Sequence, residues 1–168
     1  DGRRVVSTSA DKTVRMWDVA SGRELVPSQR GWGETVTCMA FSPDGQRIAA
    51  LALGKLWIIP VAGSARALTD VPFTARGISW SPDGKEVAWS AGSSGEEDLF
   101  AADVSTGAIR HVTALPGREA LPSYSPDGRH IAFMHQKKAG ALRIIDAHAS
   151  RPASDTAETR NLGPGAVP

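Results

Sequence analysis

The chain has 168 residues, of which 41% are hydrophobic and 22% are charged, a composition typical of a folded domain with a sizeable core. Its formal net charge of +1 gives no electrostatic basis for binding nucleic acid or an anionic membrane. The 17 glycines and 11 prolines argue against a helical bundle, and the single cysteine, Cys38, excludes an intrachain disulfide.

A four-residue motif, Ser-Pro-Asp-Gly, occurs at residues 42–45, 81–84 and 125–128, and Asp1-Gly2 matches the end of a further copy. Such a fixed period is typical of repeat architectures. Proline favours the first corner of a type I turn, and the glycine takes the left-handed conformation that follows it. The motif therefore predicts a tight hairpin turn with positive φ at Gly45, Gly84 and Gly128.

Short strands are expected around each turn, and no segment keeps a helical period. The first unit has a strand at the Val5-Val6 pair, followed by strands at 13–17 and 23–26. The later units each have four expected strands: 36–41, 47–53, 55–59 and 66–69; then 75–80, 86–90, 98–102 and 109–113; then 119–124, 130–135, 141–145 and 159–162. The apolar run from Ile48 to Gly63 is divided by Lys55 and is too short for a membrane helix, so no membrane insertion is expected.

Four short antiparallel strands per repeat of about 42 residues describe the blade of a β-propeller. Several of the strands are apolar on both faces, which fits a sheet stacked between two others. We therefore predict an all-β propeller of about four blades: an incomplete blade at 1–27, then blades at 34–70, 74–113 and 119–163. The first blade lacks one strand, so we expect the chain to be part of a larger propeller, with a small four-bladed ring as the alternative.

The first unit, from Val5-Val6-Ser7 through Asp11 to Trp17-Asp18, closely resembles a WD40 repeat. That resemblance implies a structural hydrogen-bond network of Asp11, Trp17 and a strand serine, Ser7 or Ser9. The other units depart from the WD40 pattern. Their Ser-Pro-Asp-Gly turns, and the segment 55–63, resemble the WD40-like (PD40) repeat of bacterial TolB and of the propellers of prolyl-oligopeptidase-type peptidases.

The aspartates of the repeated motif allow two interpretations. Asp44, Asp83 and Asp127 are evenly spaced carboxylates, which could indicate a metal or acid–base site, but each occupies a turn that needs Asp for backbone reasons. We interpret them as structural. The residues expected to maintain the repeat are Ser7, Asp11, Trp17, Asp44, Gly45, Asp83, Gly84, Asp127 and Gly128.

Catalytic signatures are missing from the sequence. It contains no Gly-x-Ser-x-Gly elbow, no phosphate-binding Gly-Lys-Ser/Thr loop and no dinucleotide fingerprint. None of the four histidines, His111, His130, His135 and His148, has zinc-like spacing. We expect no catalytic residues, no metal site and no cofactor, and predict that the chain is not an enzyme.

Binding is expected at one end of the blades. The turns between the first and second strands, and between the third and fourth, share one end. The remaining loops and the blade connections share the other, where length and charge vary, and loops on a rigid sheet commonly carry binding sites. The candidate contacts there are Trp32, Phe73, Arg76, Arg118, Glu119 and Lys137. Alternatively, the two aromatic residues fill gaps between blades.

These features predict a non-catalytic interaction module that binds a protein or peptide partner through the face formed by the blade-connecting loops. The alternative, allowed by the second resemblance, is an accessory propeller that gates substrates for a serine hydrolase whose catalytic domain lies outside this chain. The resemblance to TolB favours a periplasmic or other extracytoplasmic location over a cytoplasmic one.

Overall fold

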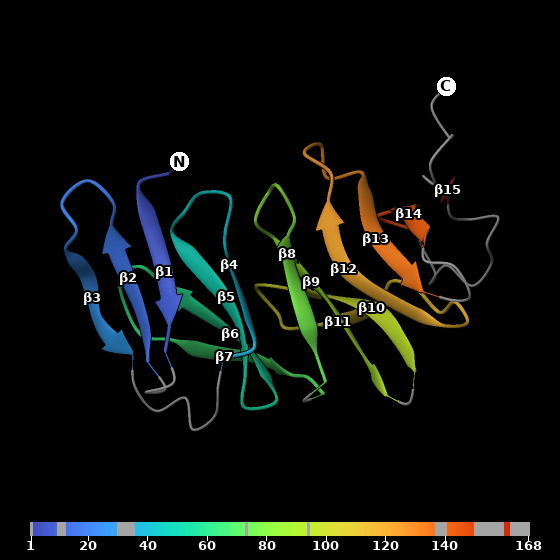
Figure 1. The fold of residues 1–168 in the computed structure, drawn as a ribbon, viewed down its shortest axis with the longest axis horizontal. Coiled ribbons are helices and arrows are strands. Elements are labelled where there is room, and N and C mark those ends of the chain that lie inside the picture. Colours follow the sequence, from blue (N-terminus) through green and yellow to red (C-terminus); the bar gives the residue numbers. More distant parts are fainter. Residues whose placement is uncertain are drawn as a thin grey trace.

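The computed structural model describes residues 2–9, 13–29, 36–72, 74–93, 95–136, 141–149 and 160–161. Over these ranges it contains fifteen β-strands and no helix, and therefore no helix that could cross a membrane. The strands form units that follow one another across the molecule (Figure 1). This confirms the predicted all-β class.

The units are antiparallel sheets whose strands follow chain order. The first contains β1 (Arg4–Thr8), β2 (Val14–Asp18) and β3 (Glu24–Gln29). The second contains β4 (Cys38–Phe41), β5 (Arg47–Ala52), β6 (Lys55–Pro60) and β7 (Arg66–Asp70). The third contains β8 (Arg76–Trp80), β9 (Glu86–Ser93), β10 (Glu96–Asp103) and β11 (Ile109–His111). The fourth contains β12 (Arg118–Tyr124), β13 (His130–Gln136), β14 (Ala141–Asp146) and β15 (Arg160–Asn161).

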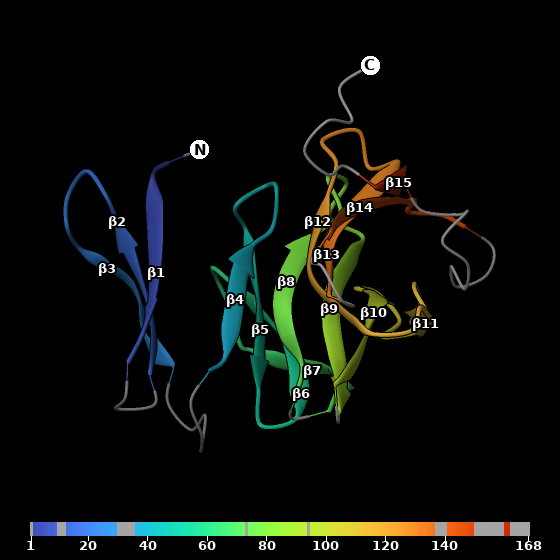
Figure 2. The ribbon, with the colours of Figure 1, turned by 45° about the vertical axis from the view of Figure 1, so that its right-hand side comes forward.

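The units stack face to face, and the first strands of the second, third and fourth units lie beside one another. Strand β8 neighbours both β4 and β12, and Figure 2 shows the same succession from a second direction. One parallel bridge, between Glu97 of β10 and Arg118 of β12, joins the third and fourth units into a continuous sheet. Stacked four-stranded blades of this kind confirm a partial β-propeller.

The predicted turns recur with the same hydrogen bonds. Ser42 Oγ donates to Asp44 Oδ1 over 2.5 Å and accepts from the Arg47 amide over 2.9 Å, while the Gln46 amide donates to the same Asp44 oxygen. The bond from Ser42 lowers the pKa of Asp44. Equivalent bonds form in the turns at 81–86 and 125–130.

The left-handed glycines are confirmed as well, with φ of 65° at Gly45, 68° at Gly84 and 72° at Gly128. The three aspartates thus orient backbone groups in turns, as the sequence predicted, and they lie in different blades. In the first unit, Trp17 Nε1 donates to Ser7 Oγ over 2.9 Å, which is one bond of the network implied by the WD40 resemblance. Asp11 lies outside the described residues.

The core lies in the seams between blades. On β5, Ile48 and Ala50 join a cluster with Val14 and Met16 of the first sheet. The alternate residues of β5, Ala49 and Leu51, join a second cluster with Trp80, Val87 and Trp89 of the third unit. Because side chains alternate between the faces of a strand, a strand buried on both faces must be apolar throughout. A further cluster joins the third unit to the fourth.

In each of the first two units, one arginine reaches across to the motif turn of the next blade. Arg4 Nη1 donates to the Gly45 carbonyl over 2.7 Å, and Arg47 Nη2 donates to the Gly84 carbonyl over 3.2 Å. Both arginines stand two residues after a motif glycine. At the third such position, Glu86 accepts a hydrogen bond from the Tyr124 hydroxyl over 2.8 Å.

Candidate functional site

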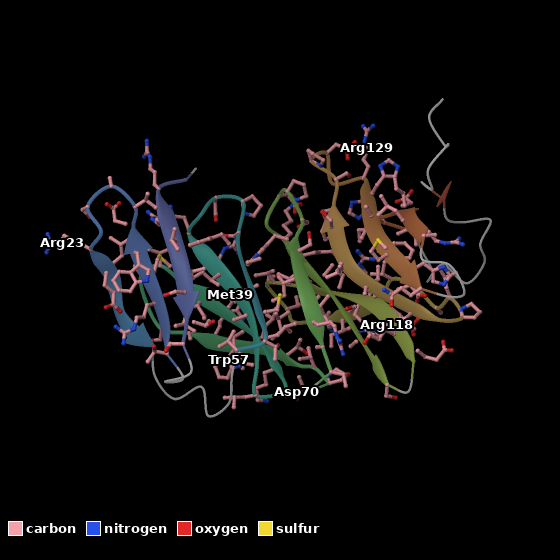
Figure 3. The ribbon with its side chains drawn as sticks, in the orientation of Figure 1. Arg23, Met39, Trp57, Asp70, Arg118 and Arg129 are labelled. Carbon is pink, nitrogen blue, oxygen red and sulfur yellow. The ribbon has the colours of Figure 1, made fainter. Side chains whose placement is uncertain are left out.

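The repeated motif turns lie at one end of the blades, and the loops that differ from blade to blade lie at the other. Figure 3 shows Arg129 beside a motif turn at the upper edge and Arg118 toward the opposite edge. We call the latter the loop edge. Of the candidate contacts placed there from sequence, the structure describes Arg76, Arg118 and Glu119, while Trp32, Phe73 and Lys137 lie outside the described residues.

Glu97 is the centre of this edge. Its carboxylate forms ion pairs with Arg76 Nη2 at 3.2 Å and with Arg118 Nε at 2.9 Å. The two arginines begin the first strands of neighbouring blades, and Glu97 lies near the start of β10, where the Gly117 carbonyl accepts a hydrogen bond from its amide over 3.1 Å. Its side chain is 7% exposed, against 47% for Arg76 and 36% for Arg118. A buried carboxylate therefore holds two partly exposed guanidinium groups together.

This arrangement suits recognition of an acceptor on a partner. A guanidinium group carries five N–H donors in a planar fork, so each arginine has donors beyond those that face Glu97. Contact with the Glu97 carboxylate also raises the pKa of Arg118, which keeps that side chain charged. Because Glu97 orients both side chains before binding, less rotamer freedom is lost when a partner engages them.

Glu119 occupies a different environment from the one expected. It follows Arg118 on β12, but its side chain points into the molecule and is fully buried. Its Oε1 lies 3.4 Å from Nε2 of His135, and its Oε2 accepts a hydrogen bond from Thr113 Oγ1 over 3.4 Å. The alternation of a strand explains the difference, because neighbours on β12 face opposite sides.

The interior beneath the loop edge is polar. Burial, then a hydrogen bond to Asp98 and the repulsion between the two carboxylates, raises the pKa of Glu119 to about 8. Nε2 of His135 also lies 3.1 Å from the Pro116 carbonyl, and Thr113 Oγ1 accepts from the Leu99 amide over 2.8 Å. These contacts tie the connection between the third and fourth units to β10 and β13.

A second histidine, His111, lies on β11, the strand that pairs with β10. His111 Nε2 lies 3.1 Å from Asp98 Oδ2, and its ring stacks on Phe100 with centroids 4.6 Å apart. The sequence has three acidic residues at 96–98, but nothing local indicated that His111 and His135 would lie close to carboxylates. No group of three or more metal-ligating side chains occurs among the residues that the structure describes.

Leu121 is a further candidate that sequence reasoning missed. It lies three residues after Arg118, is 63% exposed, and has a φ of 56° at a shift in the register between β12 and β13. Leu121 also lies close to Gly77, the neighbour of Arg76. A Cβ added to Gly77 would be 3.5 Å from the Leu121 Cα. A non-glycine residue held in the left-handed region is strained and occurs preferentially at functional sites. The available signal was Pro122, because proline within a strand indicates a bulge.

The comparisons with known proteins agree with this architecture. A family model described as the TolB beta propeller domain (PD40) matches residues 5–163, nearly the whole chain. The chain belongs to this family. Two solved TolB propellers show the same fold: TolB of Acinetobacter baumannii, with a TM-score of 0.69 and 20% identity over 89% of this chain, and a putative TolB of Agrobacterium tumefaciens, with 0.68 and 22% over 94%.

Curated relatives of this TolB propeller domain include an uncharacterized protein of Agrobacterium fabrum, which is 29% identical over 69% of the chain. The Tol-Pal system protein TolB of Francisella tularensis is 36% identical over 35% of it. The chain spans 42% and 14% of these two proteins, and 39% and 60% of the two solved structures. It therefore corresponds to only a part of each relative.

Proposed function

We propose that this TolB propeller domain is a non-catalytic module that binds a protein or peptide partner through the loop edge. The observation that carries the proposal is the Glu97 cluster, in which a buried carboxylate presents Arg76 and Arg118 from two neighbouring blades. Arginine is enriched among the residues that dominate binding energy at protein interfaces. Trp32, Phe73 and Lys137 remain proposed contacts on the same edge.

Leu121 supplies the apolar component of the proposed site. It is exposed, lies on β12 three residues after Arg118, and stands beside Gly77 of β8, the neighbour of Arg76. A central apolar contact bordered by charged groups is the usual anatomy of an interface. Glu119 and His135 act in this proposal from inside, by fixing the segment that carries Arg118. None of the relatives named above is described as a hydrolase, and we do not put the substrate-gating alternative forward.

The test begins with selection of ligands from a random peptide library against the chain, followed by calorimetric titration of the selected peptides. We expect Arg118→Ala and Leu121→Ala each to weaken binding by about tenfold or more. Arg129→Ala, an exposed arginine at the opposite edge, is the matched control and should bind normally.

Two results would oppose the proposal. One is normal binding by folded Arg76→Ala, Arg118→Ala and Leu121→Ala variants. The other is loss of binding in the Arg129→Ala control, which would place the partner at the turn edge. Thermal melting of each variant separates a change in affinity from a failure to fold.

A further inference from the structure

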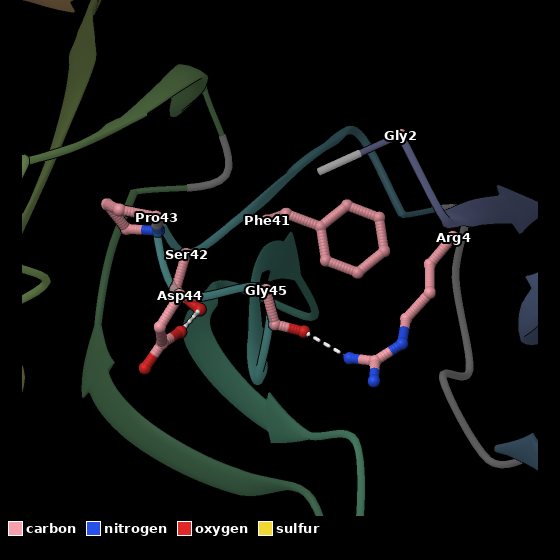
Figure 4. Close-up of a pocket in the computed structure, with 7 residues that line it drawn as sticks. All are labelled: Gly2, Arg4, Phe41, Ser42, Pro43, Asp44 and Gly45. Atoms are coloured by element: carbon pink, nitrogen blue, oxygen red, sulfur yellow. Dashed lines mark hydrogen bonds between the residues drawn. The ribbon is translucent and has the colours of Figure 1, made fainter.

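Among the residues that the structure describes, three hollows lie along the edge opposite the loop edge, where the motif turns are. The first is shown in Figure 4 and is lined by Gly2, Arg4, Phe41, Ser42, Pro43, Asp44 and Gly45. The middle one lies between the second and third blades and is lined by Arg47, Arg66, Gly84, Lys85, Asp103, Val104 and Ser105. The last lies between the third and fourth blades and is lined by Ser81, Pro82, Asp83, Asp127, Gly128 and His148.

The charges of these hollows differ although their backbones repeat. The first combines one arginine with one aspartate, and the last contains two aspartates and a histidine. The middle hollow, of about 420 Å³, gathers three cationic side chains around a single carboxylate, that of Asp103. Oδ1 of that carboxylate already accepts hydrogen bonds from Ser105 and Thr106. The middle hollow is thus the cation-rich one among the three.

Two of the cations are held in place by the neighbouring blade. Arg47 begins β5 and Arg66 begins β7, so both leave the same edge of one sheet. Arg47 Nη2 donates to the Gly84 carbonyl over 3.2 Å, and Arg66 Nη2 donates to the Val104 carbonyl over 2.6 Å. The Arg47 guanidinium also lies over the Trp80 ring, 5.1 Å from its centroid.

Two neighbouring carboxylates, together with Asp103, formally balance the three cations. Asp44 lies 3.6 Å from Arg47, and Asp83 lies 3.4 Å from Lys85. Both carboxylates are about half exposed, and ion pairs at such positions are weak and screened by salt. A ligand that enters the hollow can therefore compete with them for the arginine and lysine donors.

We infer that the middle hollow is a binding site for an oxyanion, either the carboxylate of an acidic peptide segment or a phosphate group. A guanidinium matches both through parallel N–H donors, and Lys85 adds a mobile charge at the rim, where its side chain is 78% exposed. The backbone carbonyls that hold Arg47 and Arg66 prepare the site before the ligand arrives. This site lies at the opposite end of the blades from the proposed partner surface.

The experiment follows backbone amide shifts by NMR while the chain is titrated with end-blocked tetraglutamate, inorganic phosphate or tetraglutamine. Tetraglutamate or phosphate should shift the amides of Lys85, Val104 and Ser105, and added salt should weaken the effect. Arg66→Gln and Lys85→Gln should each reduce affinity about tenfold. Arg23→Gln, an exposed arginine on the first sheet, should leave it unchanged.

The titrations with tetraglutamate and with phosphate distinguish the two sources of the oxyanion. Shifts with phosphate alone assign a free or phosphoryl oxyanion, and shifts with tetraglutamate alone assign an acidic segment. The inference is overturned if neither probe shifts these amides, if tetraglutamine shifts them equally, or if folded Arg66→Gln and Lys85→Gln variants both bind like the unmodified chain. Lys85→Gln keeps the test valid should Arg66→Gln unfold, because the ion pair that Lys85 forms with Asp83 is exposed and contributes little to stability.

Discussion

The junctions on either side of the third blade use the same repeat positions with opposite chemistry. Before the blade, Arg47 lies over the Trp80 ring and donates to the Gly84 carbonyl. Behind it, Glu86 accepts from the Tyr124 hydroxyl and pairs with Arg110 at 2.8 Å. At both junctions, the residue two places after a motif glycine (Arg47 or Glu86) contacts the residue just before the next motif serine (Trp80 or Tyr124).

The interiors of the two junctions follow this division. The first is closed by apolar residues, including Trp80 and Trp89. The second has an apolar cluster as well, but it also buries Glu119 and His135. The interior of a blade seam can thus be apolar or can also bury ionisable side chains, and only the second kind depends strongly on protonation.

Truncating an aromatic side chain of the apolar junction should have the largest effect. Trp80 is 7% exposed, and its Nε1 donates to the Ala40 carbonyl over 3.0 Å. Trp80→Ala should lower the free energy of unfolding by about 3–5 kcal/mol, because it leaves a cavity and an unpaired carbonyl. Tyr124→Phe, which removes only a hydroxyl from the polar junction, should cost about 1 kcal/mol. Denaturant unfolding measures both, and equal losses would contradict the division between the junctions.

Gly84→Ala should be the next most costly change, at about 2 kcal/mol. Its φ of 68° disfavours a side chain, and an added Cβ would lie 2.8 Å from Arg47 Nη2. Gly22 has a φ of 65° with no atom near the added Cβ, so Gly22→Ala should cost only the backbone penalty of about 1 kcal/mol. A comparison of thermal midpoints isolates the contact with Arg47, and identical midpoints would show that Arg47 moves aside freely.

Glu86→Gln should destabilise the polar junction by about 1–2 kcal/mol at neutral pH, because it removes the negative charge and one of the two oxygens that accept from Arg110 and Tyr124. The hydrogen bond from Arg110 lowers the pKa of Glu86 in the folded state. The stability that this carboxylate contributes is therefore present above its unfolded pKa of 4.5 and is lost as the pH falls through the folded value. Unfolding measured from neutral to acidic pH should show the variant and the unmodified chain converging.

Glu119→Gln should have the smallest effect at acidic pH, where Glu119 is protonated, and should show the opposite pH dependence. The pKa of Glu119 is raised from 4.5 to about 8, so folding favours its protonated form. The stability linked to that proton is complete below pH 4.5 and is lost as the pH rises toward 8. Relative to the unmodified chain, the variant should gain stability over this range, because the amide of glutamine does not titrate. Glu96→Gln, an exposed neighbour on the same edge, is the control, and parallel pH profiles would contradict the assignment.

The repeated part of this structure was predictable because its causes are local. The turn at 42–45 depends on Ser42, Asp44 and Gly45 within a single tetrapeptide, so the three copies could be interpreted together. The strands that follow were also predicted, apart from their ends. Strand β10 begins at Glu96 rather than at residue 98, which places Glu97 within a strand instead of a loop.

The candidate site was predicted only in outline because its contacts join distant segments. Arg76 and Arg118 were placed at the correct edge, but their shared partner Glu97 lies on a third segment, and no local pattern indicates that pairing. The burial of Glu119 required knowledge of which face of β12 is covered. The strain at Leu121 arises from a bulge whose position is set by pairing with β13.

The contacts of Arg4, Arg47 and Glu86 with the following blade also restrict which blades could be duplicated in tandem. A second copy of the blade β4–β7 inserted after the first would set Arg47 beside Phe41, a pairing of arginine and phenylalanine that Arg4 and Phe41 already form around one hollow. A duplicated β8–β11 blade would instead set Glu86 against Trp80, whose single donor, the indole N–H, is used on a backbone carbonyl of the preceding blade. The side chains at the junctions therefore favour one order of blades, and some blades could be duplicated in tandem only with a compensating substitution.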